Sequence, residues 1–261
     1  MRILITNDDG IDSEGLFELA HALYGAGYEI FIAAPSDNQS CISHSLTLRR
    51  PLYAGKHHIA GLEDIPAYYV TGTPSDCVRL AVGNLGAAPD VIVSGINHAP
   101  NLGTDTLYSG TVSAAIEGCM IGIPSIAVSK DTFDADFMGD AARFFARMLP
   151  KLISFFNGRP GVLNVNVPSC PEEEYKGIKV AKIGLQEYAL PFDEETEDSG
   201  RIAYRVSSVK LTECFDHDET DELYMRKGYA VITPLTYDLT DYSSIGRAKT
   251  LFETEESEAK S

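Results

Sequence analysis

The chain has 261 residues, of which 44% are hydrophobic and 23% charged, and this composition is ordinary for a globular protein with a sizeable core. The formal net charge of −17 argues against a nucleic-acid-binding protein, because a phosphate backbone requires positive partners. No apolar run approaches the roughly 20 residues of a membrane-spanning helix, so we also expect no membrane segment.

The cysteines are odd in number, widely scattered and free of any CxxC pair. This pattern favours reduced thiols over a disulfide framework or a zinc site, and so it favours a cytoplasmic protein. The first ten residues predict a strand and a loop, and we therefore expect no signal segment there. The five positions are Cys41, Cys77, Cys119, Cys170 and Cys214.

The first part of the chain predicts a β-α-β unit. The apolar run 3–5 indicates a buried strand that ends at Asp8 and Asp9. Residues 13–25 show helical spacing of apolar side chains, and residues 28–35 predict a second buried strand. Such a unit implies parallel strands joined by a right-handed crossover.

The same rhythm returns downstream. Residues 89–97 predict a strand, Ser109 is placed to cap a following helix, and residues 123–129 predict another strand. A helix over 141–153 should bend or end near Pro150, and a strand over 162–168 closes the core. These elements predict an α/β fold with a doubly wound parallel sheet.

From about Ile178 the pattern changes to alternating strands with acidic loops, which indicates a smaller β-rich extension. Residues 201–210 and 228–235 are its strands, and we expect them to form a two-stranded ribbon. The acidic stretches at 192–198, 213–222 and 252–261 are expected to be solvated loops and a frayed terminus.

Three polar stretches follow predicted strands, at the sheet edge where ligands bind in such folds. They are NDDG (7–10), SDNQS (36–40) and SGINHAPN (94–101). Their carboxylate, hydroxyl and amide oxygens favour Mg²⁺, Mn²⁺ or Ca²⁺ over softer metals. Two adjacent carboxylates repel each other unless such a cation neutralises them, which gives the Asp8–Asp9 pair a chemical reason.

The helix start LYSGTVSAA (107–115) supplies a complementary feature. Ser109, Gly110 and Thr111 are expected to present hydroxyls and backbone N–H groups at a helix N-terminus, where anions bind readily. A cation site beside an anion site indicates phosphate chemistry.

At this point the ordered motifs resemble the SurE (survival protein E) nucleotidase family, over nearly the whole chain up to about residue 242. The motifs are ILITNDDGIDSEGL, AAPSDNQSCISHSLT, VTGTPSDCV, VIVSGINHAPNLGTDTLYSGTVSAAIEG, GIPSIAVS, LNVNVP and GYAVITPLTYDLTD. The resemblance implies a Rossmann-like three-layer α/β fold with a β-rich C-terminal extension swapped between subunits, as a homodimer or homotetramer. The expected divisions are a catalytic core (1–184), an oligomerisation arm with a closing strand (185–242) and a flexible acidic tail (243–261).

The resemblance also implies a metal-dependent phosphatase that acts on nucleoside 5′- and 3′-monophosphates, with short polyphosphate as a further substrate. Carried over by position, one divalent ion per subunit would be held by Asp8, Asp9, Ser40 and Asn97. Asn101, Ser109, Gly110 and Thr111 would face the phosphate. We expect Asp8 or Asp9 to orient the attacking water and Asn101 to stabilise the phosphoryl charge.

Two departures from the family pattern stand out. Ala99 replaces a glycine and would strain its loop if that position needs a positive φ. The loop after the second strand lacks the family's basic residues and the glycine after Ser40, which puts the substrate preference in question.

Several other residues have two interpretations. Asp76 either caps a helix or lines the site, and Tyr108 stacks on a base or is incidental. His44 and His98 are expected to be incidental, and no general acid can be assigned. Asp238 and Asp241 are expected to form turns.

Two alternative functions are a non-catalytic nucleotide-binding module and a phosphorylation-switched signalling domain. The second needs a phosphoacceptor aspartate after its third strand, and residues 50–61 contain none.

Overall fold

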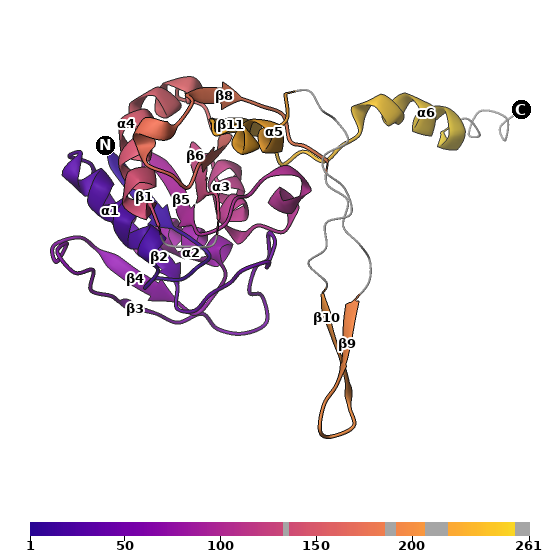
Figure 1. The fold of residues 1–261 in the computed structure, drawn as a ribbon, viewed down its shortest axis with the longest axis horizontal. Coiled ribbons are helices and arrows are strands. Elements are labelled where there is room, and N and C mark those ends of the chain that lie inside the picture. Colours follow the sequence, from indigo (N-terminus) through magenta and orange to yellow (C-terminus); the bar gives the residue numbers. More distant parts are fainter. Residues whose placement is uncertain (133–135, 186–191, 207–218, 254–261) are drawn as a thin grey trace, which may run out of the picture.

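The computed structural model describes residues 1–132, 136–185, 192–206 and 219–253. Its centre is a nine-stranded sheet in the order β3-β4-β2-β1-β5-β6-β7-β11-β8 (Figure 1). The strands are β1 Arg2–Thr6, β2 Glu29–Pro35, β3 Ala54–Lys56, β4 Ala67–Val70, β5 Val91–Asn97, β6 Ser125–Lys130, β7 Val162–Val167, β8 Ile178–Val180 and β11 Ala230–Leu235.

Helices cover both faces of this sheet, which makes three layers (Figure 1). Helices α1 and α4 pack on the face that carries Ile3 and Ile5, and α2 and α3 pack on the face that carries Leu4 and Ile92. The helices are α1 Glu14–Gly25, α2 Pro74–Gly83, α3 Gly110–Met120, α4 Met138–Phe156, α5 Asp221–Arg226 and α6 Tyr242–Phe252, with short 3₁₀ turns at η1 Gly103–Leu107 and η2 Glu172–Glu174. The predicted α/β class is confirmed.

The sheet reverses its winding beside β1. The strands β1, β2 and β4 are added in one direction, and β5, β6 and β7 are added in the other, all in parallel. The loops after β1 and β5 therefore diverge, and the crevice between them is where doubly wound proteins bind their ligands.

Of the two outcomes predicted at Pro150, a bend or an end, the end is excluded because α4 continues to Phe156. Proline in a helix interior costs about 3 kcal/mol. Buried apolar side chains lie on one face of the helix both before and after the proline, and their burial offsets that cost. They are Phe145, Leu149, Leu152 and Phe156.

The predicted ribbon of residues 201–210 with 228–235 is also wrong. Strand β11 is antiparallel to β7 and parallel to β8, so it belongs to the central sheet, and its Val231 is fully buried. The hairpin instead pairs β9, Phe192–Thr196, with β10, Ile202–Val206, and it projects away from the body (Figure 1). The stretch 192–198, expected to be a loop, is thus largely a strand, although an exposed one.

Two acidic regions differ from their predicted character. In the stretch 213–222, Asp221 is fully buried and accepts hydrogen bonds from the backbone N–H groups of Gly103 and Gly184, each at 2.9 Å. Residues 213–218 lie outside the described part. The expected flexible tail over 243–261 begins as helix α6, which has no buried residue, and residues 254–261 are likewise outside the description. The domain divisions at 184 and 242 stay predictions.

Among the described residues, no helix has both the length and the apolar character needed to cross a membrane.

Helix α1 approaches β5 so closely that one position requires glycine. A Cβ atom built on Gly15 would lie 1.9 Å from the backbone oxygen of Ile96, whereas one on Gly25 would meet nothing within 4 Å. Gly15→Ala should therefore lower the free energy of unfolding by about 3 kcal/mol, the upper end for overpacking. The matched change Gly25→Ala in the same helix should be neutral or stabilise by about 0.5 kcal/mol. Urea denaturation of both variants checks this, and equal effects would contradict the close approach.

Candidate active site

The polar residues predicted at the strand ends lie around the β1–β5 crevice. Asp8 and Asp9 follow β1, Asn97 is the last residue of β5, and Ser40 lies in the loop after β2. Helix α3 begins at the same edge of the sheet, where its Thr111 contacts Asp8.

Asn7 shapes the turn that carries the two aspartates. Its side-chain Oδ1 accepts a hydrogen bond from the N–H of Gly10 at 3.2 Å, and its Nδ2 donates to the Gly10 oxygen at 3.0 Å and to the Ser13 hydroxyl at 2.6 Å. Asn7 is fully buried. The sequence interpretation passed over it, although an asparagine directly before Asp-Asp-Gly is a recognisable turn signal.

Asp8 is buried against the first turn of α3. Its Oδ1 accepts a hydrogen bond from the Thr111 hydroxyl, and its backbone oxygen accepts one from the N–H of Gln39 at 2.7 Å. Burial raises the pKa of Asp8 to about 6, with a smaller contribution from the negative charge of Asp9, and the contacts with Thr111 oppose this rise. Without a cation, this carboxyl therefore holds its proton up to mildly acidic pH.

Asp9 lies beside Asp8 and is only partly buried. Its oxygens have two long contacts, to Asn38 Nδ2 at 3.5 Å and to the backbone N–H of His98 at 3.4 Å. Burial raises the pKa of Asp9, and the proximity of His98 opposes that shift. Neither contact has the length of a strong charge-assisted hydrogen bond, so the Asp9 oxygens keep capacity for a stronger partner.

Ser40 and Asn97 complete the oxygen-rich set. Ser40 is exposed, and its backbone N–H donates to Asn38 Oδ1 at 2.8 Å. Asn97 uses its amide nitrogen to donate to the Ala99 oxygen at 2.7 Å, which leaves its Oδ1 as the atom suited to a cation. Two carboxylates with a hydroxyl and an amide oxygen are ligands that hard divalent ions accept, so the residues fit such an ion. In the described ranges, no three His, Cys, Asp or Glu side chains gather as a metal site, so carboxylates alone would not complete one.

Asn101 is held by a buried network of asparagines. Its N–H donates to Asn166 Oδ1 at 2.8 Å, and its carbonyl accepts from Asn164 and Asn166 at 2.7 and 3.1 Å. Its own Nδ2 donates to the Ser129 hydroxyl at 2.7 Å. These partners were missed, although two asparagines inside the apolar strand LNVNVP are an unusual pattern that signals a buried polar role.

The start of α3 has the cap predicted for it, and its predicted contact with a phosphate stays a prediction. Ser109 caps α3 as predicted, and its hydroxyl accepts from the Val112 N–H at 3.0 Å. Thr111 gives its hydroxyl to Asp8. The Thr111 hydroxyl is thus already given to Asp8, whereas the Ser109 hydroxyl only accepts and keeps its own hydrogen, which an anion at the helix start can meet together with the helix dipole. Gly110 lets the turn approach, since a Cβ there would lie 2.7 Å from Asp8 Cβ.

The condition for strain at Ala99 is not met, because Ala99 is not among the described residues that adopt a positive φ. The other departure carries strain instead. Cys41, at the position where the resemblance implies a glycine after Ser40, has φ 56°, and Ser43 has φ 54°. Residues other than glycine adopt this conformation at a cost of roughly 1 kcal/mol.

Asp76, Asp238 and Asp241 each have a local structural role. Asp76 forms a capping box with Thr73 at the start of α2, and it also accepts the Thr47 N–H at 3.1 and 3.2 Å. Asp241 caps α6, and Asp238 accepts from the Thr240 N–H at 3.0 Å, so both are turn formers as predicted.

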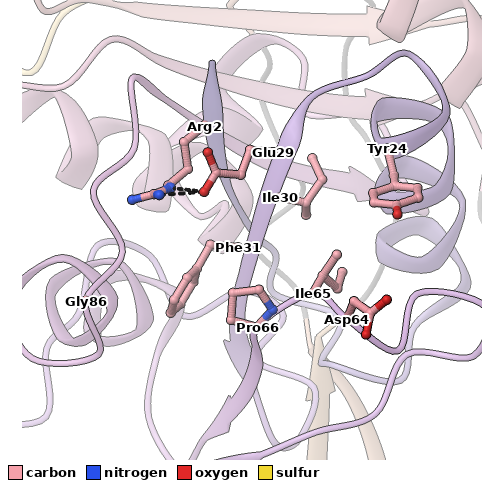
Figure 2. Close-up of a pocket in the computed structure, with 9 residues that line it drawn as sticks. All are labelled: Arg2, Tyr24, Glu29, Ile30, Phe31, Asp64, Ile65, Pro66 and Gly86. Atoms are coloured by element: carbon pink, nitrogen blue, oxygen red, sulfur yellow. Dashed lines mark hydrogen bonds and ion pairs between the residues drawn. The ribbon is translucent and has the colours of Figure 1, made fainter.

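A surface pocket of about 350 Å³ lies at the other edge of the sheet, near the starts of β1 and β2 (Figure 2). Arg2 and Glu29 form an ion pair in its wall at 2.5 Å. Because these residues begin the strands that Asp8 and Ser40 follow, this pocket is separate from the candidate site.

The fold and the site together define a doubly wound α/β protein with a carboxylate pair at its switch point. The chain belongs to the SurE family: the model of that family, described as Survival protein SurE, matches residues 3–190. This confirms the resemblance inferred from the motifs.

Individual relatives agree over nearly the full length. A protein named 5′-nucleotidase SurE from Desulfitobacterium hafniense (strain DSM 10664 / DCB-2) is 45% identical over 243 residues, 93% of each chain. One of the same name from Alkaliphilus metalliredigens (strain QYMF) is 40% identical over 96% of this chain and 98% of its own. The crystal structure of the SurE protein from Aquifex aeolicus superposes with a TM-score of 0.79 at 36% identity, covering 96% of this chain and 99% of that one.

The raised pKa of Asp8 makes the stability of the metal-free protein depend on pH. Between pH 4 and 6 the folded state keeps a proton that the unfolded chain releases, so stability falls as pH rises through this window. Asp8→Asn has no such proton and can still accept from Thr111. Its stability relative to the wild type should therefore rise by up to about 3 kcal/mol between pH 4 and 7. Urea titrations in chelator at several pH values measure this, and parallel curves for the two proteins would contradict it.

Proposed function

We propose that this protein is a metal-dependent phosphomonoesterase that hydrolyses nucleoside 5′- and 3′-monophosphates to nucleoside and phosphate, with short-chain polyphosphate as a further substrate. The observation that carries the proposal is the Asp8–Asp9 pair lying at the switch point against the N-terminus of α3. A cation-binding group beside a helix N-terminus suits a phosphate ester, whose oxygens can meet both. The name 5′-nucleotidase carried by the relatives supports the hydrolysis of nucleoside 5′-monophosphates alone.

The proposed cofactor is one divalent ion per subunit: Mg²⁺, Mn²⁺ or Ca²⁺. Asp8, Asp9, Ser40 and Asn97 would hold it. When bound, it would polarise the phosphoryl group and lower the pKa of a water molecule for attack.

The chain's own residues would orient the reactants. An Asp8 or Asp9 oxygen not used by the metal would accept a hydrogen bond from the attacking water and so align it. Asn101 has a second amide hydrogen besides the one given to Ser129, and together with the first-turn N–H groups of α3 it would stabilise the phosphoryl oxygens. The buried asparagine network fixes Asn101 in advance, so little reorganisation is needed during the reaction.

We also infer a cytoplasmic location. Cys41, Cys77, Cys119 and Cys170 are free thiols, and Cys41 is exposed, which suits a reducing compartment.

The metal requirement is tested with a panel of nucleoside monophosphates and polyphosphate, each assayed with Mg²⁺, Mn²⁺ and Ca²⁺. Turnover should need an added ion and stop with chelator. Asp9→Asn nearly preserves shape but removes a charge, so turnover should fall by at least 100-fold while the stability of the metal-free protein holds or rises.

The outcomes of this panel separate the alternatives. Full activity after exhaustive metal removal would refute the metal site. Tight nucleotide binding without turnover under every condition would instead favour a non-catalytic binding module.

We further infer that the protein works as a homodimer or homotetramer through exchange of its C-terminal arm. The hairpin leaves Phe192, Ile202 and Tyr204 more than half exposed, and α6 leaves Leu251 and Phe252 exposed at 65% and 84%. A lone two-stranded ribbon and a lone short helix are each marginal in water. A second copy that covers these elements would stabilise both.

Light scattering measures the number of subunits, and a truncated version tests whether α6 is the exchanged segment. A version that ends near Gly184 would lose β11 from the sheet, so it is unsuitable. A version that ends at Thr240 loses Asp241, α6 and the residues after it but keeps the hairpin of the predicted arm, and it should have fewer subunits per particle than the full chain where α6 is the exchanged segment. A monomeric full chain, or an unchanged subunit number after truncation, would refute exchange through α6.

A further inference from the structure

A buried carboxylate that the mechanism does not use lies in the middle of α3. Glu117 is 1% exposed, and each of its oxygens has one partner. His44 Nε2 donates to Oε2 at 2.6 Å, and Arg79 Nε donates to Oε1 at 2.5 Å. Burial would raise the pKa of Glu117, but the hydrogen bonds from His44 and Arg79 outweigh it and hold that pKa below its usual value. Glu117 is thus an ionised group whose two contacts are both strong.

The two partners of Glu117 belong to different parts of the molecule. Arg79 lies on α2, which is a fixed part of the α/β layer. His44 lies in the loop of residues 36–47, called here the Ser40 loop, which carries the proposed metal ligand Ser40. The Glu117 carboxylate therefore connects α2, which is already held by its packing on the sheet, with the Ser40 loop, whose conformation depends on such contacts.

Hydrogen bonds hold the backbone of the Ser40 loop on both sides of Ser40. Before it, the Gln39 N–H donates to the Asp8 oxygen at 2.7 Å. After it, the Ser43 N–H donates to the Tyr108 oxygen at 3.0 Å, and the Thr73 hydroxyl donates to the Ser45 oxygen at 2.8 Å. Between these anchors the backbone passes through the positive φ values of Cys41 and Ser43, a conformation that persists only when neighbouring contacts impose it.

We propose that His44 is a positioning residue: its contact with Glu117 locks the Ser40 loop onto α3, so that Ser40 is held at the Asp8–Asp9 pair and the site binds its divalent ion with full affinity. The ion-binding half of this inference rests on the function proposed above. Through Glu117, the helix whose N-terminus faces the phosphate also sets the position of the loop ligand. Residues that orient a metal ligand commonly change metal affinity by 10- to 100-fold when they are removed.

The test compares His44→Ala with the matched control Arg79→Ala, since each variant takes one strong partner from Glu117. Both should lower the melting temperature. Calorimetric titration with Mn²⁺ should show binding about tenfold weaker in His44→Ala and within twofold of wild type in Arg79→Ala. In the metal-free proteins, hydrogen exchange of the Ser43 amide should be faster only in His44→Ala. His44→Gln, which can still donate to Glu117, should recover most of the Mn²⁺ affinity.

The outcomes are distinct. If His44→Ala and Arg79→Ala weaken Mn²⁺ binding equally, or if neither weakens it, Glu117 is a purely structural ion-pair centre and the positioning role is wrong, while the proposed function stands. If the wild type itself binds no Mn²⁺, the metal site fails and this inference fails with it. If His44→Ala does not fold, His44→Asn, whose shorter side chain removes the donor from Glu117, replaces it against Arg79→Ala in the same two measurements.

Discussion

The contact between Asp8 and the first turn of α3 is the constraint around which this site is organised. It places a carboxylate, just after a strand whose residues 3–6 are buried, against a helix N-terminus whose N–H groups and dipole favour negative charge. The approach is possible because residue 110 has no side chain, and the Thr111 hydroxyl turns toward the carboxylate. The nine-stranded sheet makes this meeting possible, since the winding reverses beside β1 and leaves that edge open.

The burial that fixes Asp8 also makes it costly to ionise, and its neighbour Asp9 increases that cost. Such a pair must either retain a proton or be neutralised by a cation, and a chain of net charge −17 offers little general positive potential to help. The surrounding contacts suit the second solution. Asn7 holds the turn, and the hydrogen bond of Asn97 leaves an oxygen for a ligand. The burial of Asp8 beside the negative charge of Asp9 therefore favours the binding of a divalent ion at this pair.

Features of local origin could be predicted from the sequence. The β-α-β rhythm, the Ser109 cap and the turn roles of Asp238 and Asp241 depend on residues close together in the chain, and hydrophobic spacing and turn chemistry report such contacts directly. The motifs also placed the polar loops correctly, because parallel strands bring their carboxyl ends to one edge.

Apart from the turn of Asn7, the features that were missed or wrong depend on distant partners. Pro150 stays inside α4 because of packing on the sheet, and β11 returns to the core beside β7, which precedes it by more than 60 residues. The pairing of His44 with Glu117 spans 73 positions, and Asp221 reaches back 118 positions to Gly103. No periodicity reports contacts of this kind. The positive φ of Cys41 was likewise not predicted, because backbone φ at a loop residue follows from the anchors on either side.

The central claim is that a cation at Asp8 and Asp9 and an anion at the start of α3 share one site. Two ligands that meet in one site must change each other's affinity by the same factor. The most direct measurement is calorimetric titration of inorganic phosphate into the wild-type protein with and without saturating Mn²⁺, and of Mn²⁺ with and without phosphate. The account predicts that each ligand tightens the binding of the other by an equal factor of at least about tenfold, and it predicts that Asp9→Asn abolishes this coupling. Phosphate and Mn²⁺ affinities that are independent of each other would contradict it.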